Sequence, residues 1–367
     1  MLNVLQLMYN WGKGGYESYA INLVKKLHNR ECKFYIAYSE TLPMPEIVES
    51  LGIETFHIPM KSPYDMPAAR KVAKLCNKLS IDAVHTHFIR ERYVAAFSRI
   101  LGNKSRLIYT SHVVVPKSPA LKVTNRLVSG LEHKIIAVCL AGREQMLEEG
   151  LNPRRIKVIH NGVNIEYWKE QAASTIREEF GIADDEFVIT TTGRFNEEKG
   201  HLFLIESIKA LNELTGKNGM QFRFLLAGDG DLLEECKKLA NDLDISDKII
   251  FTGFRTDIRN ILHGSDLYVS PSRTEALSMS IIEALACGLP VVATDVGGTS
   301  EVINDENDCG MLVPYGNSTQ MAASIMGLIM DEKLYRHLKA NAFKTSSEKF
   351  NLDNTIKETY NLYKGQD

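Results

Sequence analysis

The sequence has no apolar run approaching the roughly 20 residues that a membrane-spanning helix requires. Its first residues, Met1–Met8, also lack the basic segment that precedes the apolar run of a secretory signal peptide. These two absences argue against a transmembrane protein and favour a first β-strand at the N-terminus. We therefore expect a cytoplasmic protein.

Cysteine is scarce, and no two cysteines form the C-x-x-C pair that is typical of metal or redox sites. The six positions are Cys32, Cys76, Cys139, Cys236, Cys287 and Cys309. Most of them lie in apolar surroundings, so we predict free thiols in a reducing compartment. No set of histidines has the spacing of a zinc site either.

The net charge is only −3, but it is unevenly distributed along the chain. Residues 1–165 contain 23 Lys and Arg against 13 Asp and Glu, a net charge of +10, so residues 166–367 carry −13. A basic N-terminal half suits a phospholipid surface or a lipid-linked diphosphate, although domain charges also vary without function. Because no basic groove with interleaved aromatic residues occurs, we predict no binding of nucleic acid.

A length of 367 residues favours two domains. Apolar runs alternate with amphipathic segments throughout, an order that predicts parallel sheets covered by helices. The predicted strands are Val4–Met8, Lys33–Tyr38, Thr55–Ile58, Ala83–Thr86, Leu107–Thr110, Lys134–Val138, Lys157–Ile159, Phe187–Thr192, Phe222–Ala227, Ile249–Phe251, Leu267–Val269 and Val291–Ala293. The predicted helices are Tyr16–Leu27, Met66–Leu79, Arg92–Ile100, Gly200–Leu214, Leu232–Leu243, Met279–Ala286, Thr319–Met330 and Leu352–Leu362.

The alternation breaks near Asn164, and the polar segment Glu166–Thr175 is typical of a linker. We therefore predict two Rossmann-like α/β domains, residues 1–165 and residues 166–349, followed by a C-terminal helix at about 350–367. Ligands of open α/β sheets bind beyond the carboxyl ends of the strands. We accordingly expect two parallel sheets that face each other across a binding cleft.

The most informative segment holds two glutamates, Glu275 and Glu283, separated by small or apolar residues. Glu283 would lie about 12 Å beyond Glu275 if the whole span were helical. Between them, the amides of Ala276, Leu277 and Ser278 open the predicted helix, where free N–H groups and the helix dipole attract an anion. A nucleotide-diphosphate sugar, with hydroxyls at both ends and phosphate in the middle, would satisfy all three features.

Two glutamates on a helix are more often simply exposed to solvent. Glu283, however, is embedded in an Ile-Ile-Glu-Ala-Leu run, where a carboxylate without a partner would be costly. The segment resembles the E-x7-E signature of the family 4 retaining glycosyltransferases, which have the GT-B fold. The resemblance implies that Glu275 contacts hydroxyls of the donor sugar and that Glu283 holds the ribose. It also implies that the last helix crosses back to the first domain.

A second segment, Gly193–Gly200, follows the first strand of the second half and resembles the family's G-R-x-x-x-x-K-G stretch. The leaving group of sugar transfer is a nucleoside diphosphate, whose developing charge needs a metal or fixed cations. Arg194 would supply a planar guanidinium and Lys199 a point charge. The alternative is that both side chains are merely solvated.

The glycine-rich turn that contains Gly14 and Gly15 follows the first strand and would let backbone amides approach a phosphate. The full dinucleotide fingerprint is absent because position 17 is Glu, so a dehydrogenase is disfavoured. The turn resembles the family's N-terminal Gly-Gly loop, which lies against the donor diphosphate and the acceptor. A plain strand–helix turn remains the alternative.

His112 ends a predicted strand, and the resemblance places a histidine there beside the reacting sugar carbon. Phe254 follows another predicted strand in a segment that resembles the nucleobase cradle, although it is as well suited to a core position. Asp229-Gly230-Asp231 imitates the D-x-D metal clamp, but Gly and Asp are also the residues of a strand-end turn. We therefore predict no metal requirement and no cofactor.

The resemblance implies a cytoplasmic, metal-independent, retaining glycosyltransferase that uses a nucleotide-sugar, with UDP favoured over GDP. Its acceptor would be a sugar, a lipid-linked or another small molecule in cell-envelope or extracellular polysaccharide assembly. Peripheral contact with an anionic membrane is a further hypothesis, based on the basic residues between Arg90 and Lys134. Two alternatives stay open: a sugar-nucleotide epimerase of the same fold, and a non-catalytic nucleotide-sugar-binding scaffold.

Overall fold

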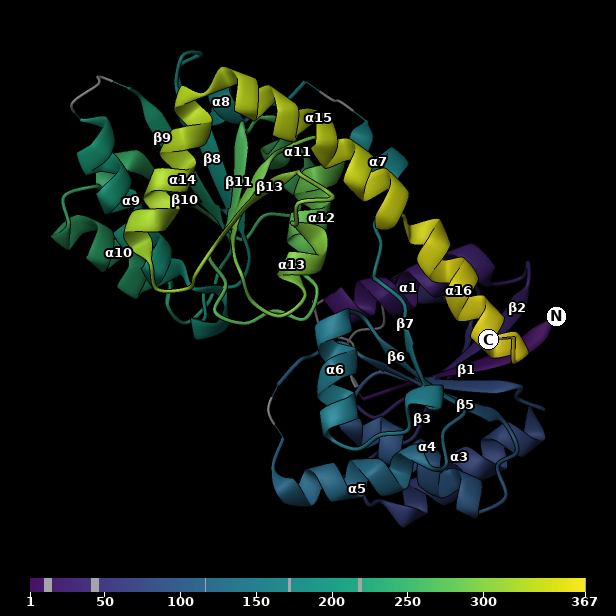
Figure 1. Cartoon of the computed structure of the whole chain (residues 1–367). Helices are drawn as coiled ribbons and strands as arrows, with labels where there is room; N and C mark the ends of the chain where they lie inside the picture. Colours follow the sequence, from purple (N-terminus) through teal and green to yellow (C-terminus); the bar gives the residue numbers. More distant parts are fainter. Residues whose placement is uncertain (10–14, 41–45, 116, 171–172, 217–219, 367) are drawn as a thin grey trace. The chain divides into compact units, whose positions relative to one another are not determined.

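The computed structural model describes residues 1–9, 15–40, 46–115, 117–170, 173–216 and 220–366 (Figure 1). The chain forms two compact units. Unit 1 comprises Met1–Asn161 together with Asp353–Asp367, and unit 2 comprises Gly162–Leu352. The division after Asn161 falls slightly before the boundary predicted at residue 165, within the same connecting segment.

Unit 1 is built on a seven-stranded sheet in the order β3-β2-β1-β4-β5-β6-β7. Every neighbouring pair in it is parallel. The strands are β1 (Leu2–Met8), β2 (Cys32–Tyr38), β3 (Glu54–His57), β4 (Ala83–Thr86), β5 (Arg106–Ser111), β6 (Lys134–Ala137) and β7 (Ile156–Val158). The strand order reverses between β1 and β4, and such a switch point is where ligands of this architecture bind.

Helices cover both faces of this sheet (Figure 1). They are α1 (Gly15–Leu27), α2 (Glu46–Ser50), α3 (Met66–Lys78), α4 (Ile89–Ile100), α5 (Pro119–Ser129), α6 (Leu140–Glu148) and α16 (Leu352–Lys364). Leu5 and Leu7 of β1 point to one face, where they share a core with Val72 of α3 and Val94 of α4. Because side chains alternate along a strand, Gln6 points to the opposite face, which α1 and α16 cover.

Unit 2 repeats the design with a six-stranded sheet in the order β10-β9-β8-β11-β12-β13, again parallel throughout. The strands are β8 (Phe187–Thr192), β9 (Phe222–Ala227), β10 (Ile249–Gly253), β11 (Leu267–Ser270), β12 (Val291–Thr294) and β13 (Gly310–Val313). Its switch point lies between β8 and β11. Near-continuous apolar runs form these strands because both faces of a parallel sheet are buried.

The helices of unit 2 form two layers around the sheet. They are α7 (Ile165–Lys169), α8 (Ile176–Phe180), α9 (His201–Thr215), α10 (Leu233–Asp242), α11 (Ile258–His263), α12 (Met279–Ala286), α13 (Thr299–Val302), α14 (Ser318–Met330) and α15 (Glu332–Lys349). Leu204 of α9 and Ile325 of α14 share a core with one face of the sheet. Ile176 of α8 and Ile261 of α11 pack on the other face.

The predicted strands are all present, and the structure adds elements that the sequence patterns did not reveal. β13 and the long helix α15 were missing from the prediction, and part of the predicted linker is the short helix α7. The six cysteines are free thiols, as predicted. No helix within the described residues has the length and apolar character needed to cross a membrane.

Candidate active site

The candidate donor site of unit 2 lies at the switch point, on the loops that follow β8 and β11. These neighbouring strands are parallel, so their carboxyl ends reach the same edge of the sheet. Two main-chain contacts tie the loops together: the Arg273 N–H donates to the Glu198 carbonyl at 2.7 Å, and the Thr274 N–H approaches the same oxygen at 3.4 Å. Arg194, Lys199 and Glu275 are thereby collected from segments far apart in the sequence.

Two glycines permit the close approach of these loops. A Cβ on Gly200, whose φ is +66°, would lie 2.0 Å from the carbonyl oxygen of Pro271. A Cβ on Gly297, whose φ is +56°, would lie 1.8 Å from the carbonyl oxygen of Glu275. Neither contact is tolerable for a side chain, so glycine is required at both positions. The loop after β12 therefore presses directly on the backbone of Glu275.

Lys199 and Glu275 form an ion pair. Lys199 Nζ lies 2.5 Å from Glu275 Oε1, and Ser272 Oγ donates to the same oxygen at 2.8 Å. The two side chains are 30% and 11% exposed, respectively. Burial alone would lower the pKa of Lys199, but the neighbouring carboxylate outweighs it and raises the pKa. Lys199 therefore stays charged.

Arg194 is exposed at the start of the same loop. Within the described part of the chain, its guanidinium makes no ion pair or hydrogen bond. A guanidinium without an internal partner keeps its donors for a ligand, and its planar fork matches phosphate oxygens. The structure thus separates the two predicted cations into one that is paired and one that remains exposed.

Ala276, Leu277 and Ser278 form a bend before the helix rather than its first turn, because α12 begins at Met279. Ser278 stands at the N-cap, and its backbone oxygen accepts from the Ile282 N–H at 3.3 Å. Among the described residues, the three bend amides donate to no acceptor. The backbone N–H groups expected to be available to a ligand are therefore present, but they precede the helix instead of forming its first turn.

Glu283 lies on α12 among the buried side chains of Ile281, Ile282, Ala284 and Leu285. Burial raises the pKa of its carboxyl to about 8, and no counter-charge offsets this effect. A buried carboxyl without a partner costs free energy, so hydrogen bonds from ligand hydroxyls would stabilise it. Its position on the helix agrees with the predicted one.

His112 belongs to unit 1 and directly follows β5, as predicted. Its Nε2 lies 3.1 Å from Nδ1 of His87, which follows the neighbouring strand β4. The Tyr19 ring of α1 packs edge-on against the His112 ring at a centroid distance of 5.4 Å. Desolvation lowers the pKa of His112 to about 3, so the imidazole is neutral.

The glycine-rich turn is only partly described. Gly14 lies outside the described residues, whereas Gly15 begins helix α1. The turn follows β1, which borders the switch point of unit 1. Its predicted contact with a donor diphosphate stays a prediction.

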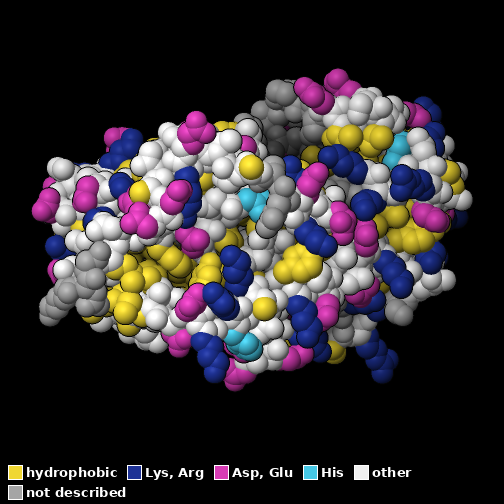
Figure 2. All heavy atoms as spheres, turned by 90° about the horizontal axis from the view of Figure 1, so that it is seen from above, with side chains coloured by type: hydrophobic (Ala, Val, Ile, Leu, Met, Phe, Trp, Pro, Cys, Tyr) yellow, Lys and Arg dark blue, Asp and Glu magenta, His cyan; other side chains and the backbone are white. Residues whose placement is uncertain are grey.

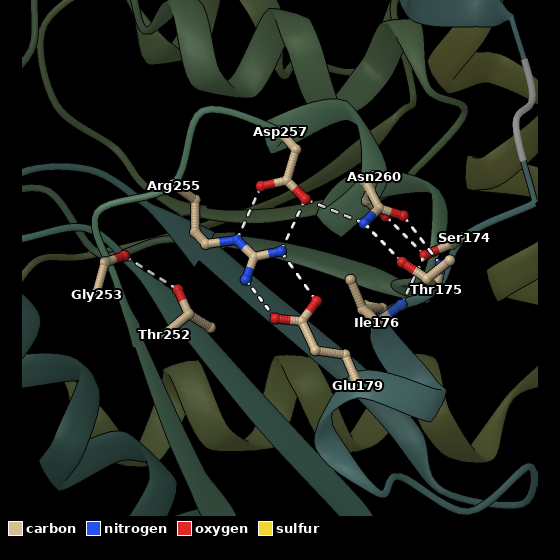
Figure 3. A network of polar contacts seen from close by, with 9 residues as sticks. All are labelled: Ser174, Thr175, Ile176, Glu179, Thr252, Gly253, Arg255, Asp257 and Asn260. Carbon is tan, nitrogen blue, oxygen red and sulfur yellow. Dashed lines mark hydrogen bonds and ion pairs between the residues drawn. The ribbon is translucent and has the colours of Figure 1, made fainter.

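Phe254 follows the edge strand β10 and is 59% exposed, so it is not a core residue. The next residue, Arg255, is fully engaged within unit 2 (Figure 3). Its guanidinium lies between the carboxylates of Asp257 and Glu179, and Asn260 continues the network to Thr175. This network holds the loop after β10, which carries Phe254, against α8 and α11.

Asp229 and Asp231 are both exposed in the turn that follows β9. Asp229 Oδ1 accepts from the Gly230 N–H at 2.8 Å, which is the hydrogen bond of a turn residue. Over the described ranges, no group of three or more His, Cys, Asp or Glu could hold a metal ion. Independence from metal stays a prediction.

Sequence reasoning missed the supporting residues of the site. Ser272 precedes the glutamate that it orients, but a serine in a loop carries no distinctive signal. The hydroxyl of Tyr268 on β11 lies 3.0 Å from the hydroxyl of Thr192 at the end of β8. This contact holds the two neighbouring strands together at the site. An aromatic residue in an apolar strand looks like any core residue, so only the pairing of β8 with β11 reveals its role.

Two family models match successive parts of the chain. Glycosyltransferase Family 4 matches residues 13–167, and Glycosyl transferases group 1 matches residues 173–345. The two matches thus cover both units.

Characterised and uncharacterised relatives extend this result. The chain is 30% identical over 319 residues to an uncharacterized glycosyltransferase of Methanocaldococcus jannaschii, covering 86% of this chain and 77% of that protein. It is 25% identical to the N-acetyl-alpha-D-glucosaminyl L-malate synthase of Bacillus anthracis, covering 82% and 79%. It is 24% identical to the UDP-Gal:alpha-D-GlcNAc-diphosphoundecaprenol alpha-1,3-galactosyltransferase of Escherichia coli, covering 95% and 93%.

Solved structures agree on the fold. A glycosyltransferase from Rickettsia africae matches with a TM-score of 0.87 at 24% identity, covering 99% of this chain and 98% of that one. Anabaena HepE in complex with UDP matches with a TM-score of 0.86 at 22% identity, covering 99% and 100%. The two Rossmann-like units are therefore those of the GT-B fold. The chain belongs to the family 4 glycosyltransferases.

Proposed function

We propose that this glycosyltransferase transfers a sugar from a UDP-sugar with retention of anomeric configuration and without a metal ion. The observation that carries the proposal is the set of groups at the unit 2 switch point: Lys199 paired with Glu275, Arg194 without an internal partner, and open amides at residues 276–278. Fixed cations and oriented amides there would stabilise the negative charge of a departing diphosphate, which is the role that a metal ion would otherwise have. The structural neighbour HepE, which was solved with UDP, supports the choice of nucleotide.

Each group has a proposed role in donor binding. Arg194, Lys199 and the amides of Ala276–Ser278 bind the diphosphate, and Glu283 accepts hydrogen bonds from the ribose hydroxyls. Glu275 accepts from hydroxyls of the transferred sugar while its ion pair keeps Lys199 in place. Phe254 contacts the base, and neutral His112 contacts the transferred sugar.

The proposed reaction is an attack on the same face of the sugar that the diphosphate leaves. The bond from the anomeric carbon to the acceptor oxygen forms as the bond to the phosphate oxygen breaks, and the acceptor proton passes to that phosphate oxygen. The charge that develops on the diphosphate is what Arg194 and Lys199 stabilise more strongly in the transition state than in the bound donor.

The acceptor proposal rests on the relatives. The Escherichia coli relative is named for a diphosphoundecaprenol-linked acceptor, so we propose a lipid-linked or related acceptor in cell-envelope or extracellular polysaccharide assembly. We also propose that the protein acts in the cytoplasm, where UDP-sugars are made.

Peripheral membrane contact is proposed for α5 rather than for the whole basic half. Several basic residues are occupied internally: Arg92 pairs with buried Glu132 at 2.7 Å, and Lys117 pairs with Glu149 at 2.7 Å. On the face shown in Figure 2, basic and acidic side chains are interspersed rather than gathered by sign. By contrast, α5 exposes Val123 by 63% and Leu127 by 71%, and this apolar pair supports an interfacial role for the helix.

The first experiment is thermal unfolding with UDP, GDP or ADP, each with EDTA and with Mg²⁺. A ligand at about 100 times its Kd adds about 2.7 kcal/mol of stability, which shifts Tm by several degrees. The proposal expects stabilisation by UDP that persists in EDTA. Stabilisation by GDP alone would redirect the donor to GDP-sugars, and no response to any nucleotide would overturn the donor site.

Turnover separates the proposed transfer from the two alternatives. An epimerase would convert the donor without an acceptor, and a scaffold would bind UDP-sugar without any product. Proton NMR of the product's anomeric coupling then distinguishes retention from inversion. A product of inverted configuration would contradict the same-face mechanism.

A further inference from the structure

A line of buried polar side chains crosses the centre of the unit 1 sheet on the face covered by α1 and α16. Side chains alternate along strands, so Gln6 of β1, His85 of β4 and Thr110 of β5 point to this face, while Leu5, Val84 and Leu107 enter the opposite core. All three polar residues have 0% exposure. His87 and His112 continue the same alternation just beyond β4 and β5.

Hydrogen bonds join these residues into one chain. His112 Nε2 lies 3.1 Å from His87 Nδ1, and His87 Nε2 lies 2.9 Å from Gln6 Oε1. Gln6 Nε2 donates to the Tyr363 hydroxyl at 3.3 Å, and this hydroxyl lies 2.7 Å from His85 Nδ1. His85 Nε2 ends the chain at the Thr110 hydroxyl, 2.7 Å away.

With the Gln6 amide as the structure places it, the donor of each hydrogen bond from Gln6 to His112 follows. Gln6 Oε1 can only accept, so the proton of His87 must be on Nε2, and His87 Nδ1 carries the lone pair. That nitrogen then accepts, so His112 must donate from Nε2. The structure places the Gln6 amide with Nε2 toward the Tyr363 hydroxyl, which leaves Oε1 facing His87, and the same hydroxyl shares a hydrogen bond with His85 Nδ1.

We propose that Gln6 and His87 are positioning residues that hold His112 in the tautomer with its proton on Nε2. The proposal rests on the proposed function only for its consequence in sugar transfer, because the tautomer is a property of the free protein. Tyr19 supports the arrangement by packing edge-on against His85 and His87 at 5.9 Å and against His112 at 5.4 Å.

The tautomer decides which ligand atoms His112 accommodates. Its Nδ1 carries a lone pair, so any hydrogen bond at this atom is one that His112 accepts, which a hydroxyl can donate and an unprotonated phosphate oxygen cannot. Burial supports this state, since desolvation lowers the pKa of His87 well below its usual value and that of His112 to about 3. The imidazole would then bind a sugar hydroxyl without attracting the diphosphate.

The first test measures the tautomer in the wild-type protein. Long-range ¹⁵N–¹H NMR of the ¹⁵N-histidine-labelled full chain distinguishes protonated from unprotonated ring nitrogens. The His112 signals are assigned with a His112→Asn variant. The proposal expects a protonated Nε2 and an unprotonated Nδ1 in the absence of ligand. The reverse tautomer, or an equal mixture, would overturn it whether or not the protein binds UDP.

Gln6→Met tests the link, since it keeps the volume but removes the acceptor for His87. His87 can then place its proton on Nδ1 and donate to His112, so the Nδ1–H form of His112 should appear. We expect at least a tenfold loss in kcat with the donor KM within about twofold. Thr110→Val is the matched control: it removes an equally buried partner from the far end of the chain, and should leave the His112 tautomer and kcat unchanged.

The outcomes separate the two claims. Unchanged His112 signals and kcat in Gln6→Met would overturn the positioning role. Equal losses of kcat in Gln6→Met and Thr110→Val would also overturn it, because they would reflect general loosening. A tautomer that changes as expected in a protein without sugar transfer would instead leave the positioning role standing and contradict the proposed function.

Discussion

Lys199 Nζ and Glu275 Oε1 are 2.5 Å apart, so the cation and the carboxylate of the candidate donor site neutralise each other in the free protein. The loops after two neighbouring strands, β8 and β11, supply the two residues, which are 76 positions apart in the sequence. The pair fixes both side chains at the switch point, which reduces the conformational freedom that donor binding would otherwise have to remove.

Lys199→Met should lower both activity and stability. It removes a cation that we propose binds the diphosphate, and it also leaves the carboxylate of Glu275, 11% exposed, without its counter-charge. We expect kcat to fall by about 100-fold, in the range for loss of one electrostatic group, and Tm to fall by several degrees. Steady-state kinetics and thermal unfolding measure the two effects. Wild-type stability would show that the ion pair contributes nothing to the fold.

Arg194→Ala should lower activity alone. Its exposed guanidinium has no partner within the described ranges, so its loss removes no internal contact. We expect kcat/KM to fall by about 100-fold with Tm within about 1 °C of wild type. Arg273→Ala is the control, because Arg273 lies in the neighbouring loop and is 62% exposed. Activity of Arg194→Ala within a factor of two of wild type would refute its role.

Glu283→Gln should stabilise the protein without ligand as the pH rises. The folded carboxyl has a pKa of about 8 against 4.5 for an ordinary glutamate, so the folded state binds its proton more tightly than the unfolded chain. Its contribution to stability is therefore complete below about pH 4.5 and is lost as the pH rises to about 8. Glutamine does not ionise and avoids this loss.

Urea unfolding at pH 5 and pH 8 measures the difference. Relative to wild type, Glu283→Gln should gain on the order of 1 kcal/mol or more between the two values. Glu144→Gln, at an exposed glutamate of unit 1, serves as the control for the chemical change. If the unfolding free energy of Glu283→Gln differed from that of wild type by the same amount at both pH values, the carboxyl would not be desolvated in the free protein.

Gly200→Ala should destabilise unit 2, because its Cβ would lie 2.0 Å from the Pro271 carbonyl oxygen at a φ of +66°. We expect a loss of about 2 kcal/mol or more from strain and loop displacement. Gly327→Ala is the opposite control: it lies within α14 with no atom within 4 Å of the added Cβ. That change should gain about 0.5–1 kcal/mol. Similar urea midpoints for the two variants would contradict the close approach of the loops.

Strong periodic segments were predictable, whereas weakly patterned ones were not. The strand ranges of the first sheet follow from apolar runs, and the structure shifts their ends by a residue or two. α15 was missed because only Leu338, Ala342, Thr345 and Ser346 are buried along it, and two of these are hydroxyl residues. β13 was missed because it is short, begins with glycine and has only Val313 fully buried.

For the candidate site, the sequence could predict individual residues but not the contacts between them. Arg194, Lys199, Glu275 and Glu283 could be selected because their spacing within single segments carries the resemblance. The ion pair of Lys199 with Glu275 depends on which strands are neighbours, and sequence spacing does not specify strand order. The histidines at 85 and 87 could be noted for their alternate spacing, but their link to Gln6 arises only from the register of β1 and β4.

Leu127→Glu tests the proposed membrane contact of α5. The side chain is 71% exposed, so replacing it removes little internal packing and should leave Tm within about 1 °C. An interfacial helix binds through its apolar side chains, and a carboxylate there also meets repulsion from anionic lipid. We expect wild type to float with vesicles of anionic lipid and Leu127→Glu to remain in the lower fractions.

Leu214→Glu, on α9 of unit 2 and 42% exposed, controls for a general loss of hydrophobic surface and should float like wild type. Equal flotation with zwitterionic and anionic vesicles would remove the electrostatic part of the proposal, and no flotation of wild type with either would remove the contact altogether.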